Sequence, residues 1–268
     1  MTASTWHQTA RRRSPYRLRP WLAVLLAAWA CASEPLVLRT AGQVSTAPKY
    51  VQQGGKVVGV CPALLAAIQA KDGHIQFTGL EVLLSTPLVE KGLQSGQLDV
   101  FCGLVKSANR QQSMRFLEPP LYHIQMRVMS RRDIGAPRDV ADLRERSQKV
   151  PVIATAGLST TRSLMEQGVK VDASSSDNLS SLRRLQAGRG QYYYSSDEIL
   201  LGLMASEHLG DWAVIQPTVF GEEDMYMVTS RQLPAEAQQR LHRALEQLAA
   251  SGELKQVVVE MKKQYGGL

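Results

Sequence analysis

The stretch that decides the fold is "LDVFCGLVKSANRQQSMRFLEPPLY", residues 98–122. Its short apolar run, residues 98–104, predicts a buried strand that carries one cysteine. A polar turn with Arg110 follows, and the stretch closes on two adjacent prolines and a tyrosine. Because the proline ring fixes φ, this end of the stretch is stiff. We interpret "EPPLY" as the lead into a hinge; the alternative is an ordinary tight turn.

Strands and helices alternate on both sides of this stretch. Before it, the pattern predicts strands at 36–42 and 75–82 and helices at 61–70 and 85–96, so residues 36–104 have the βαβαβ order of a parallel sheet. A second series follows, with strands at 124–130, 150–157, 169–174 and 191–196 and helices at 140–146, 159–168, 177–190 and 197–207. Strands at 212–219 and 223–230 and two amphipathic helices within 234–266, split at Ser251-Gly252, end the chain. Two α/β series in one chain predict two lobes.

The net charge of +7 is concentrated at the N-terminus. Residues 1–32 hold five of the 31 basic residues and no acidic one, which leaves 26 basic against 24 acidic residues in the remainder. No basic stripe with interleaved aromatic residues is present there, so we predict no nucleic-acid partner.

The N-terminal segment has the layout of a secretory signal peptide. A basic stretch precedes the apolar run "WLAVLLAAWACAS", which ends in small residues and is shorter than the roughly 20 residues that span a bilayer. We predict a signal peptide over residues 1–32, with cleavage before Ser33, and a periplasmic protein. A lipid anchor through Cys31 and an uncleaved membrane anchor are the alternatives.

Export leaves two cysteines, Cys61 and Cys102. Paired cysteines in an oxidising compartment usually form a disulfide, and we predict one here. The alternative is two separate buried thiols, which would act as small hydrophobic side chains. We predict no metal site, because no histidine lies near these cysteines at ligand spacing.

Five segments, taken together, carry a family resemblance: "GKVVGVCPALLAAI", "LQSGQLDVFCGL", "NRQQSMRFLEPPLY", "LQAGRGQYYYSSDE" and "LAASGELKQVVVEMKKQYG". In order and spacing they resemble the bacterial family 3 extracellular solute-binding proteins over residues 35–266. The resemblance implies an α/β, two-lobe, type II periplasmic-binding-protein-like fold, in which each lobe is a mainly parallel sheet flanked by helices and the ligand binds between the lobes. It places lobe 1 at 33–122 plus 224–268 and lobe 2 at 123–223, with crossovers at Pro119–Met126 and near 218–224.

The candidate ligand contacts come from the resemblance and from local chemistry. The family has an arginine at the position of Arg110, and a guanidinium can donate two parallel hydrogen bonds to a carboxylate. Gly103, at the end of the preceding strand, is also a candidate. Ser159 and Thr160 begin a helix, whose free N–H groups suit an anion; simple N-capping is the alternative.

Asp197 and Tyr50 are two further candidates. Asp197 lies near the family's aspartate for a ligand amino group, but the count from "AGRG" places that aspartate at Ser196, so Asp197 is alternatively only a helix N-cap. Tyr50 lies where the family has an aromatic residue and would supply an apolar wall. Val105 and Cys61 depart from the family pattern, which usually has a hydroxyl and an acidic residue there.

Three functions compete. We predict a non-enzymatic receptor that closes on a small polar ligand, such as an amino acid or a related small carboxylate, and presents it to an ABC permease or a membrane sensor. The second is an interaction module on the same fold that has lost its ligand. The third is an exported enzyme resembling cyclohexadienyl dehydratase, with acid/base groups from Glu118, Asp197, Glu222 or Glu223. We expect a monomer without a cofactor; the sequence identifies neither the ligand nor the permease.

Overall fold

The structure is a computed structural model of the 268-residue chain, and it describes residues 1–3 and 34–266. The predicted signal peptide, its cleavage site and Cys31 lie outside the described residues. From Glu34 onward the chain forms one compact unit. None of the helices in the described part is long and apolar enough to cross a membrane.

The alternation of strands and helices that the sequence predicts is present, with short additions. The helices are α1 (Val60–Lys71), α2 (Thr86–Ser95), α3 (Ala108–Ser113), α4 (Val140–Ser147), α5 (Ser159–Glu166), α6 (Asn178–Gln186), α7 (Asp197–Ser206), α8 (Ala235–Ala250) and α9 (Glu253–Gly266). The strands are β1 (Leu36–Arg39), β2 (Gly42–Gln43), β3 (Val51–Gln53), β4 (Lys56–Val58), β5 (Ile75–Thr78), β6 (Leu83–Leu84), β7 (Val100–Val105), β8 (Met114–Arg131), β9 (Val152–Thr155), β10 (Val171–Ser175), β11 (Tyr192–Ser196), β12 (Ala213–Ile215) and β13 (Gly221–Ser230).

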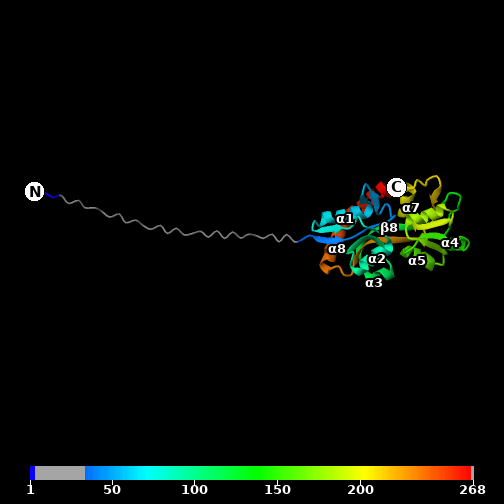
Figure 1. Cartoon of the computed structure of the whole chain (residues 1–268), viewed down its shortest axis with the longest axis horizontal. Coiled ribbons are helices and arrows are strands. Elements are labelled where there is room, and N and C mark those ends of the chain that lie inside the picture. Colours follow the sequence, from blue (N-terminus) through cyan, green and yellow to red (C-terminus); the bar gives the residue numbers. More distant parts are fainter. Residues whose placement is uncertain (4–33, 267–268) are drawn as a thin grey trace. The chain divides into compact units, whose positions relative to one another are not determined.

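Two long strands, β8 and β13, connect two groups of elements. In the seven-stranded sheet the order is β10-β9-β11-β8-β13-β7, and β12 pairs with β8. The first part of β8 pairs with the end of β13, and the last part of β8 pairs with β11 and β12. Figure 1 shows β8 between α1, α2, α3 and α8 on one side and α4, α5 and α7 on the other. We call the former group, with α9, the first half of the fold and the latter group, with α6, the second half.

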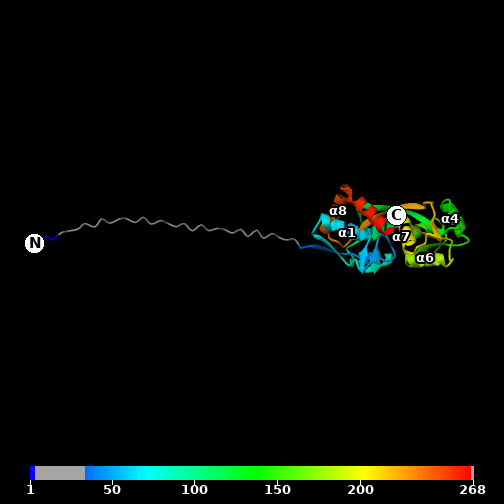
Figure 2. The same ribbon diagram turned by 90° about the horizontal axis from the view of Figure 1, so that it is seen from above.

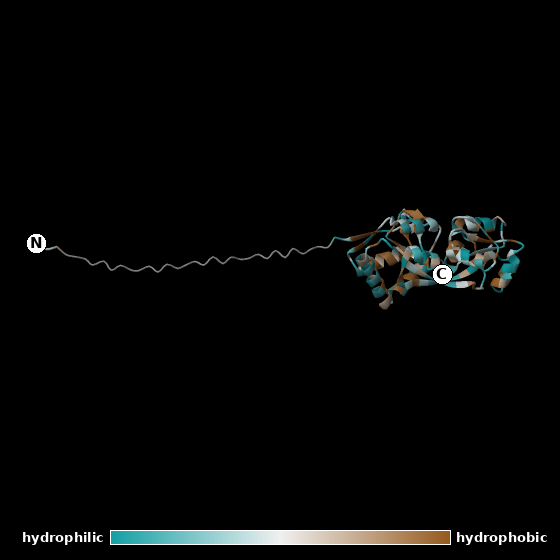
Figure 3. Ribbon diagram, turned by 90° about the horizontal axis from the view of Figure 1, so that it is seen from below, coloured by the Kyte–Doolittle hydropathy of each residue, from teal (hydrophilic) through white to brown (hydrophobic). Residues whose placement is uncertain are grey.

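Each half has its own hydrophobic core. The first core is built from residues between Leu38 and Leu121 and between Tyr226 and Val258. The second and third cores lie in the second half, and β11 separates them: Tyr192 and Tyr194 belong to one, Tyr193 to the other. Successive strand side chains point to opposite faces, so the triple tyrosine supplies both cores. Figure 3 shows the two halves side by side, joined by the crossing strands, with hydrophobic and hydrophilic residues mixed in both.

The parallel pairing predicted for each half is present in its outer strands. β1 pairs with β5, β2 with β6, and β9 with both β10 and β11 in parallel. β13 is antiparallel to both β7 and β8, and β8 is antiparallel to β11. The crossing strand β8 therefore adds an antiparallel neighbour to the parallel set of the second half, whereas β7 pairs with β13 and lies outside the β1–β5 sheet.

The "EPPLY" segment lies within β8 rather than in a turn. The β8–β13 register passes from Leu117↔Met227 to Tyr122↔Met225, so the prolines fall where the ladder is interrupted. Proline has no N–H to donate, and such an interruption is where a strand tolerates it. The stiff segment is thus an irregular part of a long strand that serves both halves.

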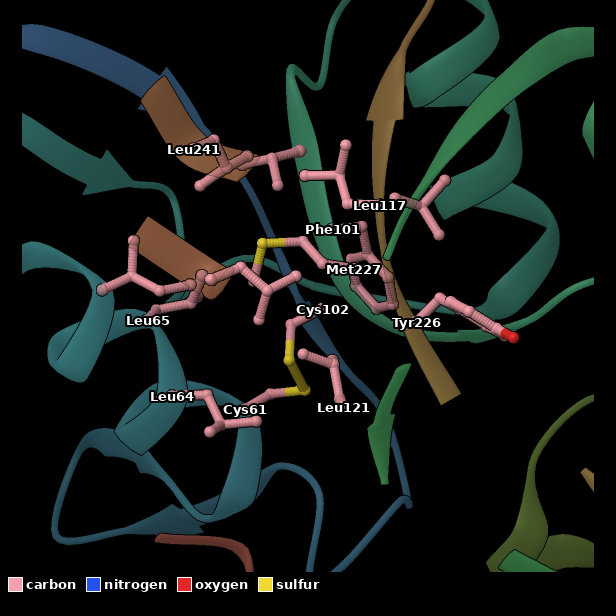
Figure 4. Close-up of a cluster of buried hydrophobic side chains, with 14 of the residues drawn as sticks. Cys61, Leu64, Leu65, Phe101, Cys102, Leu117, Leu121, Tyr226, Met227 and Leu241 are labelled. Atoms are coloured by element: carbon pink, nitrogen blue, oxygen red, sulfur yellow. A yellow bond between two sulfur atoms is a disulfide. The ribbon is translucent and has the colours of Figure 1, made fainter. Parts of the chain in front are cut away.

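The predicted disulfide joins Cys61 of α1 to Cys102 of β7, with a sequence separation of 41. Figure 4 shows it in the first core among Leu64, Leu121 and their neighbours, and both cysteines are fully buried. The bond therefore links helix α1 covalently to strand β7. On the outer side of α1, helices α8 and α9 pack against it, as the view in Figure 2 shows.

Candidate functional site

A cavity lies between the first and the second core. Its volume is about 70 Å³, smaller than the about 300–1,000 Å³ that is usual for small-molecule sites. The first half contributes Gln43, Thr46, Lys49, Gly103, Val105 and Arg110 to its lining, and the second half contributes Thr155, Ser159, Thr160, Asn178, Ser196 and Glu198. The lining combines charged, hydroxyl and amide groups with apolar side chains.

Arg110 lines this cavity, as the resemblance implied, but most of its donors are already used. Its side chain is buried; Nε and Nη2 donate to Glu90 Oε1 at 3.0 and 2.7 Å, and Nη1 donates to the Val105 carbonyl at 2.7 Å and to Ser159 Oγ at 3.2 Å. A guanidinium has five N–H groups. Glu90 balances its charge, so Arg110 joins the two halves more than it offers a free clamp.

Ser159 and Thr160 both line the cavity at the start of α5. The N-cap of α5 is Leu158, and no side chain caps the helix. The capping alternative for these two residues is therefore wrong: both stand inside the first turn. Their hydroxyls and the unpaired N–H groups of that turn face a region where an anion is favourable.

Asp197 does not line the cavity, whereas Ser195, Ser196 and Glu198 do. Asp197 Oδ1 instead accepts hydrogen bonds from the backbone N–H groups of Gln125 and Glu198, at 3.1 and 2.9 Å. Its predicted alternative role as the N-cap of α7 is also wrong, because Ser196 holds that position. Ser196, where the count from "AGRG" places the family's aspartate, does line the cavity, but the carboxylate that reaches it comes from Glu198, the residue after Asp197.

Tyr50 lies in the first core and not at this cavity. Its side chain is buried, its hydroxyl donates to the Cys102 carbonyl at 3.0 Å, and its ring packs on Phe101 with centroids 5.7 Å apart. Burial raises the pKa of Tyr50 far above its ordinary value. It also lines a second cavity, beside Val51 and Leu203. This position does not favour Tyr50 as a wall of the ligand site.

Gly103 lines the cavity, and its conformation explains why a glycine stands there. Its φ is +89°, and a Cβ atom would lie 2.7 Å from Lys49 Cδ. A larger residue at this point of β7 would be strained and would push the Lys49 side chain away. The β7–β13 register also shifts nearby, between Tyr226 and Met227.

Two charged residues of the site escaped the sequence analysis: Lys49 and Glu198. Lys49 Nζ donates to the Gly103 carbonyl at 3.0 Å, and burial lowers the pKa of Lys49 to about 8 although Glu198 opposes this shift. Burial also raises the pKa of Glu198, against the effect of Lys262 and Lys49. The "TAPKY" loop and the "DE" pair at a helix start gave only weak signals, because such residues are usually solvated.

The carboxylates of the enzyme hypothesis are not brought together. Glu118 pairs with Lys106 at 3.0 Å and is exposed, and Glu222 lies 3.4 Å from His123 in another exposed pair. Glu223 lines a different cavity, beside Lys106 and Arg162. Within the described residues, no cluster of three or more His, Cys, Asp or Glu side chains could hold a metal ion.

Solved structures share this fold at low sequence identity. A mutant of ArgBP from T. maritima is 16% identical, with a TM-score of 0.71 over 85% of this chain and 95% of that one. A histidine kinase sensor domain with similarity to periplasmic binding proteins is 21% identical, with a TM-score of 0.74 over 85% and 96%. A putative binding component of an ABC transporter from Wolinella succinogenes, complexed with lysine, is 16% identical, with a TM-score of 0.70 over 86% and 95%.

These likenesses establish the predicted α/β, two-lobe, type II periplasmic-binding-protein-like fold. A search among curated proteins found no significant match. The sequence model of one protein family, the bacterial extracellular solute-binding proteins, family 3, matches residues 38–266 of this chain. The chain therefore belongs to this family of exported binding proteins.

Proposed function

We propose that this protein is a periplasmic receptor that closes on a small polar ligand, an amino acid or a related small carboxylate, and delivers it to an ABC permease. The observation that carries the proposal is the cavity between the two halves, where buried charged groups and hydroxyls from both halves converge. Family membership and the amino-acid ligands of structural neighbours support the same conclusion.

The lobes that we propose follow the core clusters. The first core ends at Leu121 and resumes at Tyr226, while Ile124 and Met225 belong to the second core. We therefore place lobe 1 at 33–122 plus 224–268 and lobe 2 at 123–223; Met225 and Val105 are lobe 1 residues that pack on the second core at this boundary. The lobes would move about β8 near Pro119–Met126 and about the chain at 218–224. The contacts between the two lobes include Arg110 to Ser159, Asn178 Nδ2 to the Ser45 carbonyl at 2.6 Å, and Glu198 to both Tyr122 and Lys262.

A sensor role is the second candidate. A histidine kinase sensor domain has the same fold, and Glu90 already occupies two donors of Arg110, as expected if the clamp no longer serves a transported ligand. The partner would then be a membrane sensor, and the receptor would act as a monomer in either case. An enzyme is less well supported, because among the acidic residues named for it none lines the cavity.

Thermal unfolding of the purified protein, from residue 33 onward, tests the binding proposal. The panel holds the common amino acids, small carboxylates and small amines. A ligand at 100 times its dissociation constant stabilises the folded state by about 2.7 kcal/mol and raises the melting temperature. A panel without any shift would contradict ligand binding. Permease and ATPase genes beside this gene would favour transport, and a neighbouring kinase gene would favour the sensor.

A further inference from the structure

Lys49 is a buried cation that forms no salt bridge with the described residues. Its side chain is 4% exposed and lines the cavity. Within the described part of the chain its ammonium makes one hydrogen bond, to the Gly103 carbonyl, and no ion pair. An ammonium has three donors, and a buried charge without a partner is unfavourable. Glu198 attracts this ammonium by Coulomb interaction and not by direct contact, and two of the three donors have no acceptor among the described residues.

Glu198, in the second half, is a buried carboxylate whose ion pair with Lys262 is loose. Its side chain is 3% exposed, lines the cavity from the first turn of α7, and has one oxygen, Oε2, without a hydrogen bond. The nearest cation to Oε2 is Lys262 Nζ, 3.8 Å away and beyond hydrogen-bond distance. The other oxygen accepts a long hydrogen bond of 3.4 Å from the Tyr122 hydroxyl. Glu198 can therefore accept strong hydrogen bonds from a bound cation.

The remaining charges around the cavity are already matched. Glu90 balances Arg110. Asp177, which also lines the cavity, accepts hydrogen bonds from the backbone and the hydroxyl of Ser180, at 2.8 and 2.7 Å, and so caps α6. The rest of the lining includes the apolar side chains of Val105, Ile124, Met126, Leu158, Ile199 and Met225. No second free carboxylate among the described lining residues is left for a cationic side chain.

We propose that Lys49 and Glu198 are the two ligand-binding poles of the cavity: Lys49 holds the carboxylate and Glu198 the ammonium of an amino acid whose side chain is uncharged and packs on the apolar lining. This inference rests on the proposed function and deepens it. It assigns the carboxylate to Lys49 and leaves Arg110 to join the lobes. The selectivity differs from that of neighbours with arginine or lysine bound, whose ligands carry a charged side chain.

Calorimetric titration with five probes tests the assignment. Leucine has both poles, isocaproate lacks the ammonium and isoamylamine lacks the carboxylate, while arginine and glutamate add a charged side chain. We expect leucine to bind most tightly. Each single-pole analogue should bind on the order of 10–100-fold more weakly, because one charged hydrogen-bonded contact is absent.

Lys49→Met and Glu198→Gln separate the two poles. Lys49→Met should weaken the binding of leucine and of isocaproate by a similar factor and leave the affinity for isoamylamine unchanged. Glu198→Gln should weaken the binding of leucine and of isoamylamine and leave the affinity for isocaproate unchanged. The exposed positions Lys56 and Glu81 supply matched controls, Lys56→Met and Glu81→Gln. Without ligand, Lys49→Met should melt at a higher temperature than wild type, because a buried unpaired charge is removed.

The outcomes distinguish a failure of the assignment of Lys49 and Glu198 from a failure of the receptor function. Leucine binding that neither variant weakens more than its control would overturn the assignment of the poles. Arginine or glutamate binding more tightly than leucine would overturn the neutral ligand class while the receptor function stands. If no probe and no member of the wider panel binds, the receptor function itself fails. A Lys49→Met protein that is less stable than wild type without ligand would show that Lys49 has a structural role instead.

Discussion

The guanidinium of Arg110 donates a hydrogen bond to the hydroxyl of Ser159, 3.2 Å away, and this contact joins helix α3 of the first half to helix α5 of the second. Both residues line the cavity. The other donors of Arg110 serve Glu90 and the Val105 carbonyl, so Ser159 is its one described contact with the opposite half. If the lobes move as proposed, we expect closure of the cleft to bring these two side chains together.

Ser159→Ala should weaken ligand binding without unfolding the protein. The variant loses one hydrogen bond across the cleft, worth about 1 kcal/mol, which corresponds to roughly fivefold in the dissociation constant. Titration calorimetry measures the affinity, and urea unfolding without ligand should stay within about 0.5 kcal/mol of wild type. Ser163→Ala, at an exposed position of the same helix, is the control. An affinity equal to that of the control would show that the contact does not contribute to closure.

Binding of a carboxylate should depend on pH through Lys49. The pKa of Lys49 is lowered to about 8, chiefly by burial; Glu198 raises it and Arg110 lowers it. An ammonium is required to hold the anion, so isocaproate affinity should be constant below pH 7 and fall as pH rises through about 8. Isocaproate has no amine, and the arginine does not titrate in this range. A flat profile between pH 7 and 9.5 would contradict a role for the Lys49 ammonium.

The lowered pKa of Lys49 also determines how the free energy of unfolding changes with pH. A lysine whose folded-state pKa lies below its unfolded value of 10.5 destabilises the protein while it is charged in both states. Between pH 8 and 10.5 the unfolded chain binds the extra proton, so stability rises with pH by an amount on the order of 3 kcal/mol. The gap in unfolding free energy between ligand-free Lys49→Met and wild type should therefore narrow from pH 7 to pH 10.

Gly202→Ala tests the contact between α7 and the loop before β3. In an open helix this change stabilises by about 1 kcal/mol. Here a Cβ atom would lie 2.3 Å from the Ala47 carbonyl oxygen, a distance that real Cβ contacts do not show. We expect Gly202→Ala to lower both the melting temperature and the ligand affinity. Gly73→Ala, where a Cβ meets no atom within 4 Å, is the control. A Gly202→Ala protein that is more stable than wild type would show that the loop at Ala47 moves to accommodate the added methyl group at little cost.

Loss of the disulfide should destabilise the protein strongly. The bond closes a loop over a separation of 41 residues, and the chain-entropy model assigns such a loop about 4 kcal/mol. Cys61→Ala combined with Cys102→Ala should reduce the urea midpoint accordingly, and reduction of the wild type should do the same. A reduced protein as stable as the oxidised one would mean that the surrounding core alone fastens α1 to β7.

Most helices and strands followed from local patterns. Apolar periodicity and the Ser251-Gly252 break placed the two C-terminal helices within a residue or two of their observed bounds. The sequence patterns predict no strand where the β3–β4 hairpin lies, because its two strands have three residues each and none of these residues is buried. The long strand through Pro119 and Pro120 was missed because an interrupted ladder is a tertiary feature: it depends on where β13 lies.

The candidate site was predicted less completely, for a reason of geometry. Successive side chains of a helix point about 100° apart around its axis. Glu198 therefore lines the cavity while its neighbour Asp197 does not. The sequence alone does not predict which of the two does so, because the choice depends on the orientation of α7. Lys49 reaches the cavity only because Gly103 leaves room beside β7. Tyr50, one residue further along, turns into the core and bonds the Cys102 carbonyl.

The most direct measurement is a crystal structure of the protein grown with saturating leucine. The account predicts leucine in the cavity between the two halves, with its carboxylate within hydrogen-bond distance of Lys49 Nζ, its ammonium on the Glu198 carboxylate and its side chain against Ile124 and Met126. A leucine carboxylate bound by Arg110 instead, with Lys49 and Glu198 untouched, would contradict the account, as would a cavity that stays empty at saturation.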